Sequence, residues 1–318
     1  MLIHLATIVV GFIVLTWSAD RFVVGAAGTA RHLGIPTLII GLTIVGIGTS
    51  APELLVSAIA AWEGSAGLAV GNGVGSNIAN TGLILGCTAL IIPLQVRSRL
   101  LKREIPLLFA IMAVTYLLIV DGELARWEGI ALVLGMASLL AWMGLQGRDA
   151  SDALGMEFED KIPAEAPLGR SLVWLAVGLL LLLASSRALV WAAVNIAQSL
   201  GVSDLVIGLT VVALGTSLPE FAASLASARK GEHDIAIGNV IGSNMFNLLG
   251  VIGVAGAIAP LQTEPAVVYR DFPAMAAITL AFAVMALSRR GHGLINRVEG
   301  AVLLLGYIAF QALLYVTS

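Results

Sequence analysis

The stretch "GIGTSAPELL", residues 46–55, places Pro52 and Glu53 inside an apolar segment of membrane-spanning length. A very similar stretch, "ALGTSLPEFA", recurs at residues 213–222 and again lies within an apolar segment. Proline removes a backbone hydrogen bond from a helix, and a carboxylate at the centre of a bilayer costs about 2.5 to 3.5 kcal/mol. A chain that carries both costs twice is expected to use these two places for function.

The composition is that of a polytopic membrane protein. Of the 318 residues, 58% are hydrophobic and only 12% are charged, which is too little charge to cover the surface of a soluble domain. The formal net charge is −3 and no basic tract stands out, so we expect no nucleic-acid partner. The single cysteine, Cys87, excludes an intrachain disulfide, and the apolar N-terminus is typical of a retained first helix rather than a cleaved signal peptide.

A bilayer core takes about 20 apolar residues per helix, and this length predicts an all-α protein with ten transmembrane helices. Their expected ranges are 2–19, 36–61, 67–92, 105–120, 129–145, 171–194, 205–228, 235–258, 272–287 and 300–317. One long polar connection divides them into five and five. We therefore expect a first five-helix unit at residues 1–145, a linker at 146–170 and a second unit at 171–318.

Basic residues in the connecting loops predict the orientation, because such loops tend to stay in the cytoplasm. If the N-terminus faces outward, the inner loops hold 13 lysines and arginines and the outer loops hold 2. Arg21 and Arg187 are left out of this count, since the first and sixth helices can extend over them. Both termini are thus expected on the extracellular or periplasmic side, with the linker in the cytoplasm.

The two opening stretches belong to an internal repeat. A shift of 167 positions carries Gly48-Thr49-Ser50 onto Gly215-Thr216-Ser217 and "GNGVGSNIAN" (71–80) onto "GNVIGSNMFN" (238–247). Separate matches at one shift indicate a duplication. Because each unit has five crossings, an odd number, the second unit must enter the membrane from the opposite side. The sequence therefore predicts the inverted repeat of secondary transporters, with interrupted helices around a site near the membrane midplane.

The repeated motifs are rich in oxygen donors. Asn72, Ser76 and Asn80 lie four residues apart on one helix face, and the same spacing recurs in the second motif. Hydroxyl, amide and carboxylate oxygens suit Ca²⁺, Na⁺ and, less well, Mg²⁺, whereas zinc, copper and iron would need thiolates or histidines that these motifs lack. The candidate ligands are Thr49, Ser50, Glu53, Ser76, Asn80, Thr216, Ser217, Glu220, Ser243 and Asn247.

Simpler interpretations exist for each feature. Ser50 and Glu53 form a capping-box pattern, so Ser50 is expected to cap the helix that starts after a break near Gly48 and Thr49. The broken turns are also expected to free backbone carbonyls. Arg187 could form a salt bridge to a glutamate, but one arginine cannot neutralise two carboxylates. The glycines of both motifs are assigned to close helix packing, and single serines or asparagines could serve only as hydrogen bonds between helices.

Both motif pairs resemble the alpha-repeats of the calcium/cation antiporter superfamily, and the chain is most similar to short prokaryotic members of the sodium/calcium exchanger family. The two repeats would cover residues 41–86 and 208–253. The resemblance implies a transporter without a cofactor, in the inner or plasma membrane of a prokaryote, that exchanges Ca²⁺ for Na⁺ or H⁺. It implies Glu53 and Glu220 as Ca²⁺ ligands, helped by Thr49 and Thr216. The remaining residues would complete Na⁺ sites or lie at the centre of the cluster: Ser50, Ser76, Ser217, Ser243, Asn80 and Asn247.

One position bears on the choice of cation. Potassium-dependent members of the superfamily, and some archaeal members, carry aspartate where this chain has Asn247, which argues against K⁺ co-transport. The hydroxyl groups beside the glutamates favour Na⁺, although burial favours a protonated carboxyl, so H⁺/Ca²⁺ exchange stays an alternative. The first and sixth helices, which lack the motifs, are expected to move during alternating access. Less favoured functions are an intramembrane carboxylate hydrolase, which needs paired acids sharing a water, and a cation channel.

Overall fold

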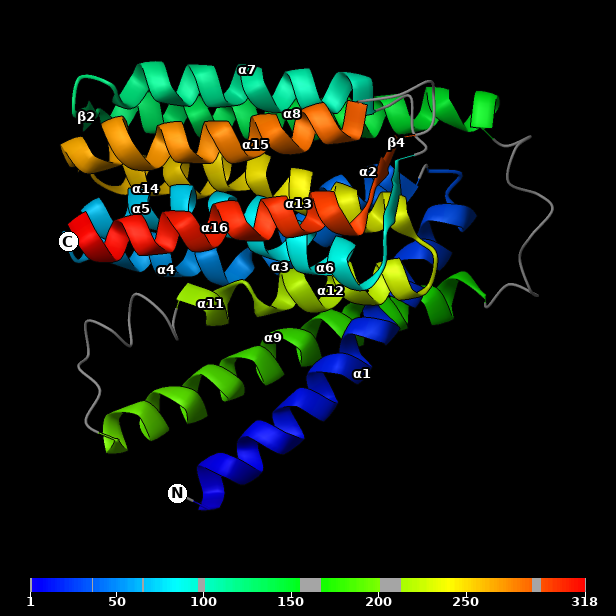
Figure 1. Ribbon diagram of the computed structural model, residues 1–318. Coiled ribbons are helices and arrows are strands. Elements are labelled where there is room, and N and C mark those ends of the chain that lie inside the picture. Colours follow the sequence, from blue (N-terminus) through cyan, green and yellow to red (C-terminus); the bar gives the residue numbers. More distant parts are fainter. Residues whose placement is uncertain are drawn as a thin grey trace.

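The computed structural model describes residues 2–35, 37–64, 66–96, 101–154, 167–200, 213–287 and 293–317. Across these residues the chain is mostly helical, and the helices run roughly side by side (Figure 1). Two pairs of very short strands complete the regular structure of the described part.

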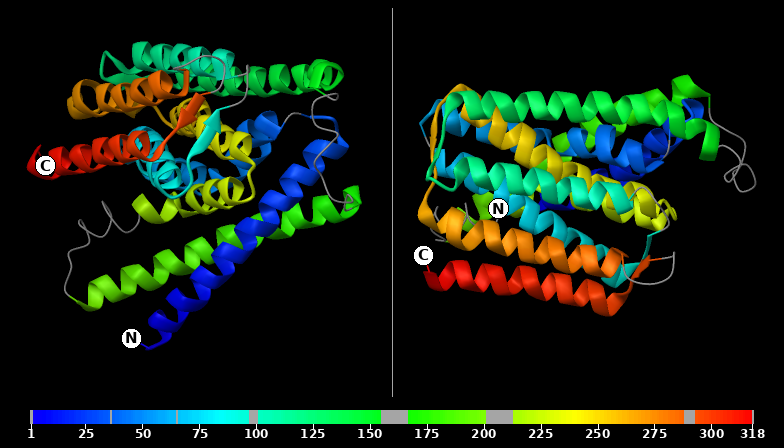
Figure 2. Two further views of the ribbon diagram at one scale, coloured as in Figure 1. Left: turned by 45° about the vertical axis from the view of Figure 1, so that its right-hand side comes forward. Right: turned by 90° about the horizontal axis from the view of Figure 1, so that it is seen from above.

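Two long helices, α1 (Leu2–His32) and α9 (Leu168–Ser199), cross each other along one side of the bundle (Figures 1 and 2). Glycine allows this close crossing. A Cβ atom on Gly25 of α1 would clash with the backbone nitrogen of Leu175, and one on Gly178 of α9 would lie 2.5 Å from the backbone nitrogen of Phe22. The two backbones therefore pack directly on each other, as small residues permit in apolar surroundings.

Helix α1 is longer than the predicted span 2–19, because its charged residues have partners. The guanidinium of Arg21 lies 5.6 Å from the ring centroid of Trp17 and 5.0 Å from that of Trp174. Asp20 lies 3.5 Å from the Lys230 ammonium group. Cation–π contact and ion pairing let the helix continue past the point where the apolar sequence ends.

The segment that contains the opening stretch forms an interrupted helix. It bends by 52° between residues 41–49 and 51–62, with Ser50 at the break. The second copy breaks at Ser217, which has nearly the same backbone conformation: φ −86° and ψ 2°, against φ −85° and ψ 9° at Ser50. Pro52 and Pro219 stand in the first turn of the following helix, where proline costs no hydrogen bond. The elements are α2 (Thr37–Ile40), η1 (Gly41–Val45), α3 (Gly46–Thr49), α4 (Ala51–Trp62), α11 (Ala213–Thr216) and α12 (Leu218–Arg229). The predicted breaks are thus confirmed.

The "GSN" motifs lie on the two long candidate spans whose apolar windows are the most deeply buried. The apolar window within residues 69–91 is 72% buried and that within 233–258 is 83% buried, against 17% for the last helix of the chain. Each of the two contains a wide π-helical turn, at Ala79–Ile84 and Asn247–Val251, of a kind often found at functional sites. The elements are α5 (Ala66–Ile78), η2 (Ala79–Ile84), α6 (Leu85–Ile91), α13 (His233–Phe246), η4 (Asn247–Val251) and α14 (Ile252–Ile258).

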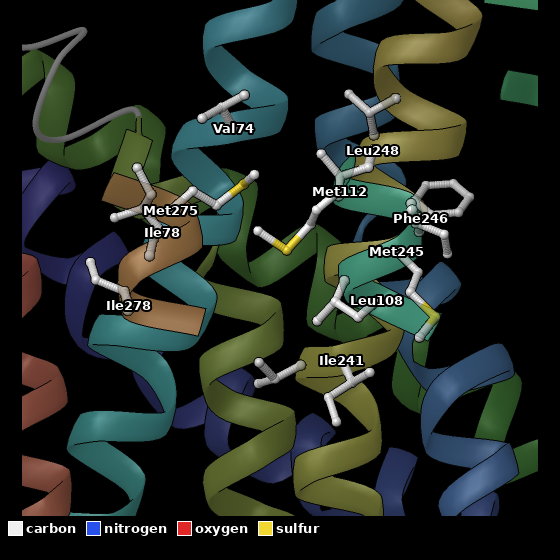
Figure 3. Packing of buried hydrophobic residues seen from close by; sticks show 14 of the residues in the cluster. Val74, Ile78, Leu108, Met112, Ile241, Met245, Phe246, Leu248, Met275 and Ile278 are labelled. Carbon is white, nitrogen blue, oxygen red and sulfur yellow. The ribbon is translucent and has the colours of Figure 1, made fainter. Parts of the chain in front are cut away.

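The remaining helices surround this centre. They are α7 (Leu101–Ile119), α8 (Arg126–Leu154), η5 (Val267–Asp271), α15 (Phe272–Leu287) and α16 (Arg297–Thr317). Helix α8 packs on α14 and α16 packs on α6. Figure 3 shows Leu108 and Met112 of α7 among buried side chains of α13, including Ile241 and Met245. The apolar core therefore joins both halves of the chain.

Two antiparallel strand pairs also link the halves. Strand β1 (Leu94–Val96) pairs with β4 (Gly293–Ile295), and β2 (Glu123–Leu124) pairs with β3 (Leu261–Gln262). The pairs lie at opposite ends of the helices, with β4 on the right and β2 on the left of Figure 1. Strands β1 and β3 begin at repeat-equivalent positions, so each end of the molecule has one such link.

Seven helices of the described part are long and apolar enough to cross a membrane, or eight if the bent pair around Ser50 counts as one span. They correspond to eight of the ten predicted spans. Predicted span 105–120 forms helix α7, and predicted span 205–228 begins at 205–212, outside the described residues. Helix α8 continues to Leu154, past the expected end at 145 and into the expected linker, of which residues 155–166 also lie outside the described part.

Candidate cation-binding site

The two glutamates of the repeated motifs lie in the first turns of α4 and α12, and both are buried, with Glu53 1% and Glu220 0% exposed. The Ser50 hydroxyl donates a hydrogen bond of 2.9 Å to Oε1 of Glu220. Because Ser50 precedes the helix that carries Glu53, this bond joins the two motifs directly. The carboxyl groups are also near enough to interact electrostatically.

Equivalent asparagine side chains stabilise the first turns of α4 and α12, which carry the two glutamates. The Asn72 amide donates to the Glu53 backbone carbonyl at 3.1 Å and to the Ser57 hydroxyl at 2.9 Å. In the second motif, Asn239 donates to the Glu220 carbonyl at 3.2 Å and to the Ser224 hydroxyl at 2.9 Å. Asn72 and Asn239 therefore fix the backbone of the glutamates rather than their carboxyl groups.

Side chains of helix α13 form hydrogen bonds with the residues at the break before α4. The Ser243 hydroxyl donates to the Gly46 carbonyl at 3.2 Å, and the Thr49 hydroxyl lies 3.0 Å from the Val45 carbonyl and 3.1 Å from Oδ1 of Asn239. The expectation that the turn from Gly46 to Thr49 leaves its carbonyls free is therefore wrong for Gly46, because the Ser243 hydroxyl and the Ser50 backbone N–H both donate to its carbonyl.

Several oxygens in this region have no hydrogen-bond partner among the described residues. A buried acceptor without a partner costs about 1–3 kcal/mol, so such atoms are rare and need a reason. Helix α4 packs on η4 and α12 packs on η2, which brings each glutamate helix against the π-helical turn of the other motif. The oxygens are Oε2 of Glu53, Oδ1 of Asn80, Oγ of Ser217, Oε2 of Glu220 and Oδ1 of Asn247. Both motifs therefore contribute buried oxygen acceptors that lack a protein partner among the described residues.

Half of the predicted ligands thus contribute an unpartnered oxygen, and the others lie close by in the fold. Thr49, Ser50 and Ser243 use their hydroxyls in the hydrogen bonds described above. Ser76 is buried on α5 and Thr216 is half-buried at the end of α11. The structure therefore brings both copies of the motifs together, and five of the ten candidate ligands have a side-chain oxygen without a hydrogen-bond partner in the described structure.

Two simpler interpretations do not match the structure. Ser50 stands at the N-cap of α4 as expected, but its hydroxyl makes no capping bond and binds Glu220 instead. Arg187 is exposed on α9, and the ion pairs of the described residues include neither Arg187 nor the two glutamates. Neutralisation of the glutamates by this arginine is thus not seen in the described part of the chain.

Sequence reasoning missed two residues of the region, Asn77 and Asn244. Their side chains are 1% and 2% exposed and bind the amides of Asn247 and Asn80. A signal was present, since both stand in the repeated "GSN" triplet. They lie one position away from the four-residue stripe of candidate ligands, and that stripe excluded them.

Comparisons with known proteins point the same way. The family model described as sodium/calcium exchanger protein matches residues 3–145 and 170–316. The inner membrane protein YrbG of Escherichia coli is 39% identical over 319 residues, which cover 99% of this chain and 98% of YrbG. CaxA of Alkalimonas amylolytica is 49% identical over 317 residues, 99% of each chain. The sodium/calcium exchanger MaX1 of Methanosarcina acetivorans is 31% identical over 348 residues, 98% of this chain and 99% of MaX1.

A solved structure has the same fold. The sodium-calcium exchanger NCX_Mj, soaked with 2.5 mM Na⁺ and 0.1 mM Ca²⁺, matches with a TM-score of 0.84 at 31% identity over 98% of both chains. The same exchanger soaked without Na⁺ and Ca²⁺ matches with a TM-score of 0.85 at 32% identity, over 98% of this chain and 99% of that one.

The apolar helices and these relatives define a multi-pass integral membrane protein that is a transporter and not an enzyme. More specifically, the chain belongs to the sodium/calcium exchanger family, and its class of activity is antiport of Ca²⁺ against another cation.

Proposed function

We propose that this protein exchanges Ca²⁺ for Na⁺ by alternating access at a site formed by Glu53 and Glu220 near the membrane midplane. The observation that carries the proposal is the set of unpartnered buried oxygens that both motifs contribute, two of which belong to buried carboxyl groups. A buried charge persists only when it is paired. A bound cation gives both carboxylates a partner at once.

The donor set suits the two proposed ions. Ca²⁺ takes about six to eight oxygen ligands, including carboxylates and amide carbonyls. Glu53 and Glu220 supply two negative charges, and Asn80, Asn247 and Ser217 add neutral oxygens. One Ca²⁺ neutralises this charge, and so does a group of monovalent ions. Ca²⁺ and the monovalent ions therefore compete for the same oxygens, and this competition is the physical basis of exchange.

We further propose the architecture that alternating access needs: ten membrane-spanning helices in two inverted five-helix repeats, residues 1–145 and 171–318. Segment 146–170 would connect them in the cytoplasm. Two observations support an inverted arrangement. The repeat-related strand pairs lie at opposite ends of the helices, and both chain termini lie toward the end opposite the start of α9 (Figure 1). Both termini would thus face the extracellular or periplasmic side.

Na⁺ is the favoured counter-ion because hydroxyl and amide oxygens surround the carboxylates, and a proton would need no such donors. The names of MaX1 and NCX_Mj also describe sodium/calcium exchange. Exchange of Ca²⁺ for H⁺ is the second candidate, since a buried carboxyl group readily takes up a proton.

Uptake of radiolabelled Ca²⁺ into proteoliposomes tests the proposal. Vesicles loaded with Na⁺ should accumulate Ca²⁺ when diluted into Na⁺-free buffer, whereas a K⁺ gradient should have no effect. A pH gradient alone that drives uptake as well as Na⁺ does would replace this proposal with the proton-coupled one. Persistent uptake in Glu53→Gln or Glu220→Gln would show that the ligands are assigned wrongly.

A further inference from the structure

Four buried asparagines form a cross-linked amide network between the two motifs. The Asn80 amide donates to Oδ1 of Asn244 at 3.2 Å, and the Asn247 amide donates to Oδ1 of Asn77 at 3.1 Å. All four side chains are at most 2% exposed. Each proposed amide ligand is therefore held by an asparagine of the opposite motif.

The direction of the hydrogen bond between Asn77 and Asn247 follows from one fixed acceptor. The Asn77 amide donates to the Asn244 backbone carbonyl at 3.1 Å. A carbonyl oxygen can only accept, so Asn77 must turn its NH₂ group there and its Oδ1 toward Asn247. Asn247 must then present its own NH₂ group to Asn77, which turns its Oδ1 away.

The other half of the network has the same arrangement of hydrogen bonds, with the Thr81 hydroxyl in the place of the backbone carbonyl. The Asn244 amide donates to the Thr81 hydroxyl at 2.8 Å, and its Oδ1 accepts from Asn80. Asn80 and Asn247 are thus both held with the NH₂ group bound to protein. Their Oδ1 atoms are left buried and without a partner in the described structure.

We propose that Asn77 and Asn244 are positioning residues that hold the Asn247 and Asn80 amides with their oxygens toward the transported cation. The inference rests on the proposed exchange function. An amide that is free to turn would present its NH₂ group to the site for part of the time. That group repels a cation and donates to the nearby carboxylates, so the network raises cation affinity without contacting the ion.

Leucine and aspartate variants separate positioning from packing. Asn77→Leu and Asn244→Leu remove the anchors, and loss of one such bond is expected to weaken Ca²⁺ binding about tenfold or more. The two aspartate variants should differ from each other in Ca²⁺ affinity. The Thr81 hydroxyl can turn and donate to an aspartate at 244, so Asn244→Asp keeps the acceptor for Asn80 and is expected to bind within about threefold of the unchanged protein.

Asn77→Asp should behave differently, because the Asn244 backbone carbonyl cannot donate to a carboxylate. This variant is expected to lose about tenfold in Ca²⁺ affinity, as the leucine variant does. The two aspartates add the same charge at repeat-equivalent positions. A charge effect alone would therefore change both affinities alike, and only positioning through the network distinguishes them.

The measurement is equilibrium binding of radiolabelled Ca²⁺ to purified full-length protein in detergent, with thermal unfolding in the presence of a chelator to confirm folding. Normal binding by both leucine variants, or equal binding by the two aspartate variants, would overturn the inference. Failure of the proposed function gives a different pattern: the unchanged protein does not bind Ca²⁺, or Glu53→Gln binds it normally. If a leucine variant does not fold, the difference in Ca²⁺ affinity between Asn77→Asp and Asn244→Asp still tests the inference.

Discussion

Ser50 and Ser217 occupy the same backbone conformation at equivalent breaks of the two repeats, but only Ser50 hydrogen-bonds the glutamate of the opposite repeat. The Ser217 hydroxyl is buried without a partner in the described structure. Equivalent residues thus have different contacts in the two halves. The inverted-repeat architecture that we propose requires such inequality, because a transporter of this kind opens to one side of the membrane at a time.

This difference predicts unequal effects of two matched substitutions. Ser50→Ala removes a hydrogen bond to a carboxyl group, worth about 1.5–3 kcal/mol when that group is charged, whereas Ser217→Ala removes a hydroxyl that has no partner. In the presence of a chelator, Ser50→Ala should therefore lower the unfolding temperature more than Ser217→Ala does. Equal unfolding temperatures would mean that the Ser50–Glu220 bond does not stabilise the ion-free protein.

The glutamates should contribute to ion binding rather than to stability. Glu53→Gln removes one of two interacting buried carboxyl groups, so the ion-free variant is expected to be at least as stable as the unchanged protein. Saturating Ca²⁺ at about 100 times its Kd should stabilise the unchanged protein by about 2.7 kcal/mol. The variant should lose this stabilisation, as thermal unfolding with and without Ca²⁺ would reveal. A similar Ca²⁺-dependent shift in both proteins would contradict the assignment.

The crossing of α1 and α9 should tolerate no added side chain. Gly25→Ala places a methyl group against the Leu175 backbone, and overpacking of this kind typically costs about 1–3 kcal/mol. Gly169→Ala is the control on α9, where a Cβ meets nothing within 4 Å. Alanine there should preserve or raise stability, since alanine is the better helix former. Thermal unfolding of both variants checks the expectation, and equal stability would mean that the helices can separate freely.

An ion pair connects α1 to the turn between α12 and α13. Arg31 lies 2.6 Å from Glu232, with both side chains partly exposed, so the pair should add no more than about 1 kcal/mol to stability. If α1 moves during transport, as we expect, Glu232→Gln should change the Ca²⁺ exchange rate severalfold and leave Ca²⁺ affinity unchanged. Asp271→Asn breaks the Arg270–Asp271 pair between neighbouring residues and serves as control. Equal rates in all three proteins would argue against motion of α1 past this turn.

The sequence predicted the features that depend on local pattern. Apolar length and the repeated "GTSxPE" stretches located the interrupted helices, because a proline and a glutamate are both costly in such segments and occur together there twice. The position of Ser50 at a helix start followed from the same pattern. Its hydroxyl, however, binds Glu220, 170 positions away, and a local sequence pattern cannot predict so distant a partner.

The features that the sequence did not predict are set by contacts between the repeats. Asn77 lies beside the expected ligand stripe and acts on Asn247 of the other motif, 170 positions away. The Gly46 carbonyl is occupied by Ser243, again from the opposite motif. The extension of α1 over Arg21 was allowed for in the sequence, but the partners of Arg21 were not predicted. They are two aromatic rings, one of them on α9.

The most direct test of the central claim is the location of Ca²⁺ in crystals of the purified protein, by its anomalous scattering at long wavelength. We predict one strong peak within coordination distance of both Glu53 and Glu220, which weakens when Na⁺ replaces Ca²⁺ in the soaking solution. A peak elsewhere, or no peak together with both carboxyl groups bound only to protein, would contradict the proposed site.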